Sequence, residues 1–189
     1  MLNVKYSDID YDHAYLNEHC RHEDWAIELL LKRYIRINDD VLDLGSGTGF
    51  VKRLIWNKCN LTQVDLDKEF CGEFGAIWGD AYKVLKAVEV NEFDVITATF
   101  SINYMHPFTI WRMLKKCGRN VIVVMYDRPF LEGSESYYAG NKKLFTRLHR
   151  AKQFVINGII WLLRKNIVYD KNLLGEPYYR VVILERKGR

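Results

Sequence analysis

Proline and long hydrophobic runs are both scarce in this chain. The 189 residues include three prolines and no Gly/Ser- or Pro-rich stretch, so we expect a single domain without internal linkers. The longest apolar stretch, residues 154–163, is interrupted by Asn157 and Gly158 and has about half the ~20 residues that a membrane span requires. Residues 1–12 lack the apolar core of a signal peptide. We therefore expect neither a transmembrane segment nor a secretory signal.

Closely spaced cysteines are absent as well. The four cysteines are scattered along the chain, with no Cys-x-x-Cys pair. Scattered thiols are typical of a reducing compartment, whereas disulfide frameworks and zinc sites use paired cysteines. We therefore predict a cytoplasmic protein without a metal site.

Positive charge is concentrated in one segment. The whole chain has a net charge of +4, but residues 140–172 hold eight basic side chains and the single acid Asp170. Such a segment favours contact with RNA, another polyanion or an anionic membrane surface, although a solvated helix face explains it equally well. The predicted polyanion contacts are Lys142, Lys143, Arg147, Arg150 and Lys152.

Hydrophobic periodicity predicts an N-terminal helical third followed by alternating strands and helices. Apolar residues at helical spacing indicate helix before Asp40. Short apolar runs predict strands at 41–44, 61–65, 76–78, 93–100, 121–126, 166–169 and 178–185. Helices are expected at 50–58, 68–74, 82–88, 108–117 and 141–163, the last either continuous or broken at Asn157-Gly158.

This alternation predicts the fold class. Strands separated by helices form parallel sheets with right-handed crossovers, and the last two strands are too close in sequence for a crossover and should pair antiparallel. We predict an α/β fold with a Rossmann-like, doubly wound, mostly parallel seven-stranded sheet, an antiparallel C-terminal hairpin and helices on both faces. Residues 1–189 would form one domain, made of a helical lid (1–39), a cofactor-binding core (40–126), a basic helical insertion (127–165) and closing strands (166–189).

A glycine-rich turn follows the first predicted strand, in the run Val41-Leu-Asp-Leu-Gly-Ser-Gly-Thr-Gly-Phe50. Glycines allow a tight turn and a close approach of backbone to ligand, and the helix N-terminus offers free N–H donors. The spacing Gly-x-Gly-x-Gly departs from the dinucleotide pattern Gly-x-Gly-x-x-Gly, and Asp43 would repel a pyrophosphate, so NAD is disfavoured. Asp65 and Asp80 follow the next two strands and should join Asp43 at the carboxyl edge of the sheet.

The glycine-rich run resembles the first motif of class I S-adenosylmethionine-dependent methyltransferases. The resemblance continues in order through Gln63-Val-Asp65, Gly79-Asp-Ala81, Phe93-Asp-Val-Ile96 and residues 114–123, and it covers roughly residues 40–126. It implies methyltransferase activity with S-adenosylmethionine as the cofactor.

The resemblance also implies which residues bind that cofactor. Asp43 would help to hold the amino group, Asp65 the ribose hydroxyls and Asp80 the adenine amine, while Leu66 would pack on the adenine face. The complete implied set is Asp43, Gly45, Ser46, Gly47, Gly49, Asp65, Leu66, Asp80, Ala81, Thr99 and Phe100.

The acceptor is expected beside the segment after the fourth strand, residues 99–107. This segment lacks the Asn/Asp-Pro-Pro-Tyr pattern of amino-methylating nucleic-acid enzymes. It faintly resembles the Gln-Phe-x-x-His-Tyr stretch of mRNA cap guanine-N7 methyltransferases, with Asn103 in place of the histidine. Asn103, Tyr104 and His106 are the candidate catalytic residues, since Tyr104 can stack on a base and His106 can act as a base near neutral pH. For His106 we favour the plainer explanation that it starts the next helix.

The predicted function is methyl transfer to RNA or another anionic substrate. A small-molecule acceptor stays open, as does a catalytically inactive protein that keeps the fold as a nucleic-acid-binding or partner subunit. Aminopropyl transfer is disfavoured because the fourth strand carries no acidic pair suited to polyamines. The tyrosines at positions 6, 11 and 15 either cover the cofactor as a lid or pack on a surface helix.

Overall fold

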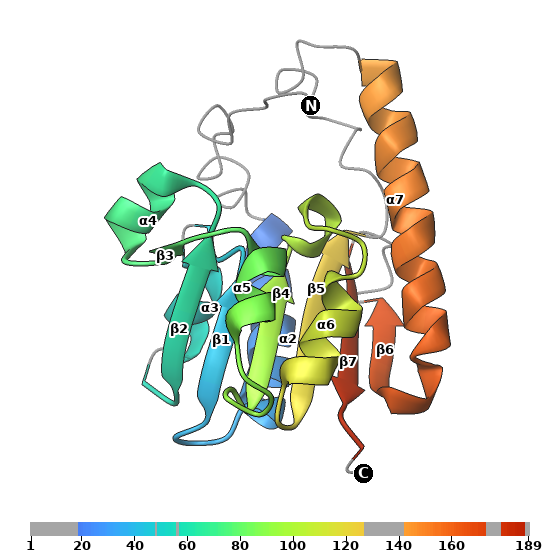
Figure 1. Cartoon of the computed structure of the whole chain (residues 1–189). Helices are drawn as coiled ribbons and strands as arrows, with labels where there is room; N and C mark the ends of the chain where they lie inside the picture. The colour runs from blue at the N-terminus through green and yellow to red at the C-terminus, as the bar shows by residue number, and fades with distance from the viewer. Residues whose placement is uncertain (1–18, 48, 56, 127–141, 173–178, 188–189) are drawn as a thin grey trace.

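Seven strands form one sheet in the computed structural model of the chain, which describes residues 19–47, 49–55, 57–126, 142–172 and 179–187 (Figure 1). The strands are β1 (Asp40–Leu44), β2 (Asn60–Asp65), β3 (Ile77–Trp78), β4 (Val95–Thr99), β5 (Asn120–Tyr126), β6 (Ile167–Asn172) and β7 (Tyr179–Glu185). Their order across the sheet is β3-β2-β1-β4-β5-β7-β6. The predicted α/β fold class is confirmed.

The strand order reverses between β1 and β4. Strand β1 pairs in parallel with β2 on one side and with β4 on the other, and β5 extends the parallel set beyond β4. Strand β7 then pairs antiparallel with both β5 and β6, as predicted for the closing strands. In open α/β sheets, ligands bind in the crevice at the carboxyl ends of the strands beside such a reversal.

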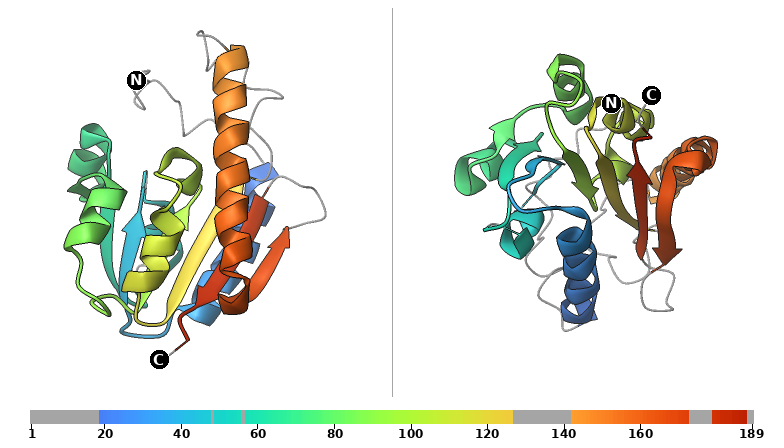
Figure 2. Two further views of the ribbon diagram at one scale, coloured as in Figure 1. Left: turned by 45° about the vertical axis from the view of Figure 1, so that its right-hand side comes forward. Right: turned by 90° about the horizontal axis from the view of Figure 1, so that it is seen from below.

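Helices cover both faces of the sheet (Figure 2). On one face lie α2 (His19–Tyr34) and α3 (Phe50–Ile55), and on the other α5 (Ala81–Ala87), α6 (Thr109–Lys116) and α7 (Lys142–Leu162). The short helix α4 (Lys68–Phe74) lies beside the β2–β3 edge, and two 3₁₀ turns, η2 (Ile102–Tyr104) and η3 (Arg164–Asn166), complete the described elements. Because both faces are covered, every residue of the central strand β4 is buried.

Helix α7 is continuous through Asn157-Gly158, so the alternative of a break there is wrong. Packing outweighs the low helix propensity of glycine, because Ile156, Ile159 and Ile160 flank the pair and are buried against the sheet. The Asn157 side chain accepts a hydrogen bond of 2.9 Å from Arg180 on β7. Arg180 also forms a bidentate pair with Asp170 on β6, which links the helix to the closing hairpin.

The other differences from the predicted elements lie at their ends. Helix α2 stops at Tyr34 rather than continuing to Asp40, because Asn38 takes a left-handed conformation with φ 66° and the chain turns into β1. Helix α3 ends at Ile55, not at position 58, whereas β6 is longer than predicted and contains a bulge between Ile167 and Tyr169. The predicted lid tyrosines lie outside the described residues. None of the helices that the structure describes has the length and hydrophobicity of a membrane span.

The two sides of α7 should respond differently to truncation. Ile160 is 2% exposed, whereas Phe154 is 79% exposed. We expect Ile160→Ala to lower the free energy of unfolding by about 2–4 kcal/mol because it leaves a cavity in the core. Phe154→Ala should change it by no more than about 0.5 kcal/mol. Urea denaturation of both variants measures the difference, and equal losses would contradict the described seating of α7.

Candidate functional site

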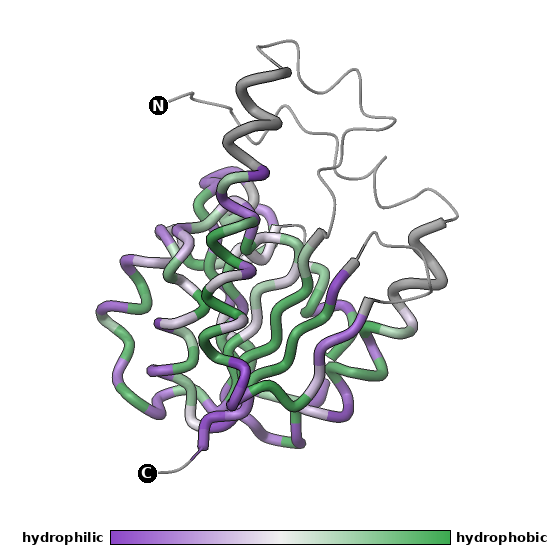
Figure 3. Tube along the Cα trace, turned by 90° about the vertical axis from the view of Figure 1, so that its right-hand side faces the viewer, coloured by the Kyte–Doolittle hydropathy of each residue, from purple (hydrophilic) through white to green (hydrophobic). Residues whose placement is uncertain are grey.

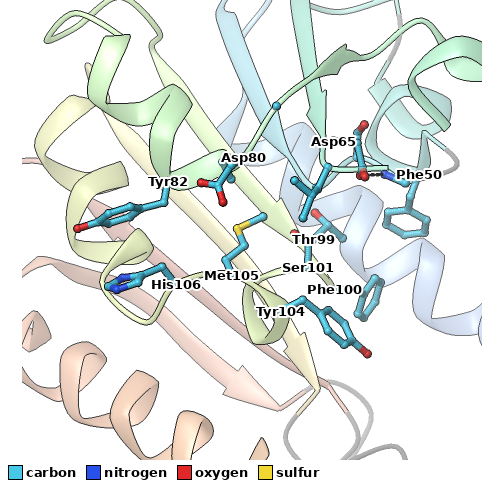
Figure 4. A pocket seen from close by; sticks show the side chains of 16 residues that line it. Phe50, Asp65, Asp80, Tyr82, Thr99, Phe100, Ser101, Tyr104, Met105 and His106 are labelled. Atoms are coloured by element: carbon cyan, nitrogen blue, oxygen red, sulfur yellow. Dashed lines mark hydrogen bonds between the residues drawn. The ribbon is translucent and has the colours of Figure 1, made fainter. Parts of the chain in front are cut away.

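A pocket opens at the carboxyl ends of β1, β2, β3 and β4, at the reversal of strand order (Figure 4). Its wall is contributed by the turn after β1, the ends of β2 and β4, and the segments that follow β3 and β4. The lining residues are Gly45, Ser46, Gly47, Phe50, Asp65, Leu66, Gly79, Asp80, Ala81, Tyr82, Thr99, Phe100, Ser101, Tyr104, Met105 and His106. The structure thus brings together nine of the eleven residues predicted to bind the cofactor, all but Asp43 and Gly49.

The turn after β1 requires glycine at Gly45 for two reasons. Its φ is +69°, which L side chains rarely adopt. A Cβ at this position would also lie 2.4 Å from Ser101 Cβ. Ser101 is fixed there because its hydroxyl donates a 2.7 Å hydrogen bond to the carbonyl of Leu44. The turn can therefore pass close to the end of β4, and the pocket floor is formed by their contact.

Asp65 closes the turn from the end of β2. Its Oδ2 accepts a 2.7 Å hydrogen bond from the backbone N–H of Gly47, and its Oδ1 accepts one of 2.8 Å from the N–H of Asp67. Each carboxylate oxygen can accept a further hydrogen bond. A half-buried carboxylate held in this way can bind a pair of ligand hydroxyls without moving.

Asp80 has a structural role in addition to its place in the pocket. It is the N-cap of α5, and its Oδ1 accepts a 2.9 Å hydrogen bond from the N–H of Lys83. Ala81 begins that helix beside it. Across the pocket, Leu66 is 55% exposed although it is a large apolar residue, which gives a flat or apolar ligand group a surface to pack on.

Two buried hydroxyl groups line the pocket without a partner among the described residues. These are Ser46 Oγ, in the glycine turn, and Thr99 Oγ1, at the end of β4. Buried polar atoms are normally hydrogen-bonded in native structures. Their position identifies two places where a polar ligand atom would be bound.

Asp43 lies beneath the pocket rather than in its wall. It is 1% exposed, its Oδ1 accepts a 2.7 Å hydrogen bond from the Thr97 hydroxyl, and its Oδ2 accepts one of 3.4 Å from the Gln63 amide. Burial raises the pKa of Asp43 to about 6, against the lowering effect of these two hydrogen bonds. Gly49 is outside the lining as well, at the start of α3, where its N–H donates to the Ser46 carbonyl.

The three candidate catalytic residues occupy different positions. Tyr104 and His106 line the pocket. The His106 ring lies against that of Tyr82 with centroids 4.3 Å apart. Its carbonyl accepts hydrogen bonds from the N–H and hydroxyl of Thr109, in the turn that precedes α6, whose N-cap is Phe108. Asn103 does not line the pocket: it is 3% exposed and its amide donates to Gln153 of α7.

Five lining residues escaped the sequence-based prediction, namely Phe50, Gly79, Tyr82, Ser101 and Met105. Tyr82 and Met105 belong to the segments that follow β3 and β4, and both are next to predicted site residues in the sequence. The signal that could have found Tyr82 is its place directly after Asp80-Ala81. In the structure it is held by Arg112, whose guanidinium lies 3.9 Å from the ring centroid and donates to its hydroxyl.

Phe100 adopts an unusual conformation at the end of β4, with a φ of +58°. Its N–H donates a 2.7 Å hydrogen bond to the Val124 carbonyl, and its ring meets Phe50 edge to face at 5.6 Å. Left-handed backbone at a large residue is costly and concentrates at functional sites. It turns the chain sharply at the pocket wall.

The structure describes the side chains of only two of the five basic residues predicted to contact a polyanion. Arg150 is exposed, whereas Lys152 is half-buried and its pKa is lowered by that burial. The side chains of Lys142, Lys143 and Arg147 lie outside the described residues.

Comparison with known proteins shows the fold. No protein-family model matches the sequence, and no curated protein matches it. Among solved structures, a protein of Methanococcus maripaludis assigned as an S-adenosyl-L-methionine-dependent methyltransferase has a TM-score of 0.63 and 14% identity, covering 98% of this chain and 94% of its own. A SAM-dependent methyltransferase of Archaeoglobus fulgidus has a TM-score of 0.55 and 16% identity over 94% and 100% of the two chains.

A third similar structure contains a ligand in its crystal. Magnesium protoporphyrin IX methyltransferase of Synechocystis, with bound SAM, has a TM-score of 0.54 and 13% identity over 99% of this chain and 86% of its own. At such identities the likeness shows a shared fold. The chain therefore has the fold of class I methyltransferases.

Replacing Gly45 should disrupt the turn. We expect Gly45→Ala to lower the free energy of unfolding by about 2–4 kcal/mol, because it combines a left-handed backbone with a clash against Ser101. Gly72→Ala in α4 is the matched control, since a Cβ there meets nothing within 4 Å, and it should be neutral or slightly stabilising. Thermal and urea denaturation measure both, and an unaffected Gly45→Ala variant would contradict the described contact.

Asp43 should make stability depend on pH. Its pKa is raised in the folded state from 3.8 to about 6, so the protonated carboxyl favours folding below pH 4, and this contribution is lost as the pH rises through about 6. The total change is about 3 kcal/mol. Urea denaturation at several pH values should show Asp43→Asn gaining stability relative to wild type between pH 4 and pH 7. Parallel profiles would show that Asp43 titrates normally.

Proposed function

We propose that this chain, which has the fold of class I methyltransferases, binds S-adenosylmethionine and transfers its methyl group to an acceptor. The observation that carries the proposal is the combination of Asp65 and the two unpartnered hydroxyls of Ser46 and Thr99 around one glycine turn. The hydroxyls supply hydrogen-bonding atoms deep in the pocket, and Asp65 supplies a carboxylate at its wall. A ligand with a polar chain, a diol and a flat ring matches these positions.

The residues present fit each part of this cofactor. Asp65 would hold the ribose hydroxyls, Leu66 would pack on the adenine, and the free oxygen of Asp80 would face the adenine amine. The methionine part would lie over Gly47, where a Cβ would meet nothing within 4 Å, and so has room. Asp43 would act from beneath, as a negative charge that favours the amino group, through the hydrogen bonds that it shares with Thr97 and Gln63.

Methyl transfer requires mainly that the protein position the acceptor against the cofactor. The cofactor, when bound, supplies a methyl group on a sulfonium that is already a good leaving group. Holding a nucleophile in line with that methyl can supply much of the rate acceleration, and a general base is needed only if the nucleophile loses a proton. In this proposal Tyr104 orients the acceptor at the pocket wall and His106 is available as a base, while Asn103 positions Tyr104 through the contact of η2 with α7.

For the acceptor, we propose RNA or another anionic substrate that approaches along α7, with a small molecule as the alternative. Support comes from the basic residues of that helix, of which Arg150 is exposed. Neutralising Lys142, Lys143, Arg147 and Arg150 together should weaken RNA binding and reduce its dependence on salt. Unchanged affinity would leave the small-molecule alternative.

The cofactor proposal is tested by calorimetric titration with S-adenosylhomocysteine. We expect wild type to bind, and Asp65→Ala to lose affinity at least about tenfold, because hydrogen bonds to a charged group contribute about 1.5–3 kcal/mol each. Glu73→Ala on the exposed side of α4 is the matched control and should bind as wild type does. NAD should not bind.

Two results would count against the proposal in different ways. No binding by folded wild type would overturn the cofactor assignment. Binding without transfer of labelled methyl to RNA, DNA or small-molecule pools would favour the alternative of a catalytically inactive protein that keeps the fold as a binding or partner subunit.

A further inference from the structure

The outward side of α7 is apolar where a surface helix is normally polar. Phe154, Trp161 and Leu162 are 79%, 61% and 64% exposed. Together with the exposed Gly158 they recur at positions i, i+4, i+7 and i+8, which is one side of a helix. We call these four residues the α7 outer face. The buried residues Ile156, Ile159 and Ile160 lie on the opposite side, against the sheet.

The exposed residues on the outer side of α7 differ in composition from the exposed residues of α4 and α5. From position 150 to position 165, the exposed residues include no acid, serine, threonine, asparagine or glutamine: they are Arg150, Ala151, Phe154, Val155, Gly158, Trp161, Leu162, Arg164 and Lys165. The exposed positions of α4 and α5, in contrast, are mainly lysine and glutamate. Large exposed apolar patches on soluble domains mark contact sites.

Basic residues stand at both ends of the α7 outer face. Arg150 precedes Phe154 by one helical turn, and Arg164 and Lys165 follow Trp161 and Leu162. The Arg164 guanidinium lies 4.6 Å from the Trp161 ring centroid, so charge and apolar surface are continuous. Figure 3 shows the last turns of α7 as hydrophobic until the hydrophilic residues at the helix end.

We propose that the α7 outer face docks on an anionic phospholipid bilayer, with the helix lying in the plane of the interface. Apolar side chains there enter the headgroup–acyl boundary while flanking arginine and lysine meet lipid phosphates. Tryptophan is the residue type most typical of this boundary. The apolar part of α7, residues 154–162, is about 14 Å long, which suits a helix segment lying on a membrane rather than one crossing it.

Two other partners, a second copy of the chain and RNA, fit the α7 outer face less well. A second copy packed on this face, parallel or antiparallel about Gly158, would bring Arg150 toward Arg150, Arg164 or Lys165 of its partner, and like charges repel. RNA would satisfy the basic residues but would leave Phe154, Trp161 and Leu162 without an apolar environment. The bilayer is the partner that satisfies both components.

Only the start of the α7 outer face lies toward the carboxyl edge of the sheet, whereas its end lies at the amino edge, where β6 begins. The inner side of the same helix contacts η2 through the 2.9 Å hydrogen bond between Asn103 and Gln153, and Tyr104, next along the chain, lines the pocket. The docking proposal does not depend on the proposed cofactor or reaction, because it rests on the exposed side of α7 alone. It does use Arg150, which the proposed RNA path along α7 also uses, so bilayer and RNA are alternative partners of that residue.

Co-sedimentation of the full chain with vesicles tests the proposal without any cofactor. We expect binding to vesicles of phosphatidylcholine with phosphatidylglycerol, and much weaker binding to phosphatidylcholine alone. Trp161→Ser should lower the partition coefficient roughly tenfold, and the double variant Arg164→Gln/Lys165→Gln should lower it roughly thirtyfold at low salt. Brominated lipid should quench tryptophan fluorescence in wild type and markedly less in Trp161→Phe.

Matched controls exist on the opposite face of the sheet. Trp25 on α2 is 63% exposed, and Trp25→Ser should bind vesicles as wild type does. Lys52→Gln/Arg53→Gln on α3 removes the same charge as the α7 double variant and should have a clearly smaller effect. Circular dichroism verifies that all variants are folded.

Three results would overturn the proposal. One is a wild type that binds neither kind of vesicle. Another is vesicle binding that falls in the charge variants but is unaffected by Trp161→Ser and by Phe154→Ser, which would show electrostatic adsorption without insertion of the apolar residues. The third is a dimer in sedimentation velocity that Trp161→Ser dissociates, which would assign the face to a second copy of the chain.

Discussion

A buried carboxylate under the glycine turn joins the three central strands of the sheet. Asp43 of β1 accepts hydrogen bonds from Thr97 of β4 and Gln63 of β2, directly below the point where the strand order reverses. Burial of this carboxylate is costly, and it raises the pKa of Asp43 in spite of the two hydrogen bonds. The two hydrogen bonds offset part of it, and they fix the ends of β1, β2 and β4 relative to one another, which is where the pocket is built.

The pocket follows from this arrangement. Gly45 can approach Ser101 because β1 and β4 are neighbours, and Asp65 can hold the turn because β2 lies on the other side of β1. Backbone strain at Phe100 then directs the segment after β4 across the opening. The rigid parts of the site therefore come from strand ends, whereas the residues of the proposed acceptor side come from the segments beyond them and from α7.

Features that depend on neighbouring residues in the sequence were predicted well, whereas features that depend on contacts between distant segments were not. Residues 41–44 and 121–125 are buried, and the hydrophobicity of these runs predicted the strands to which they belong. The acids at the carboxyl edge followed from the predicted strand order. Asn103 was chosen by its place after β4, but the packing of α7 on η2 directs it to Gln153. Tyr82 and Met105 reach the pocket only through tertiary folding. The continuity of α7 through Gly158 likewise depends on the isoleucines that pack around it.

The hydrophobic periodicity of α7 could not predict which of its apolar residues are buried and which are exposed. A run with apolar residues on every side of the helix predicts burial all round, yet α7 lies at one margin of the sheet, where β6 is the last strand. Among the residues that the structure describes, only one side of the helix packs on other elements. Its inner side is accounted for by Ile156, Ile159, Ile160 and the link to η2. The remaining apolar residues, Phe154, Trp161 and Leu162, contribute nothing to that core, and no stability argument requires them to be apolar. The proposed bilayer contact accounts for their apolar character, and the arginine and lysine at the margins of the face match the anionic lipids of that partner.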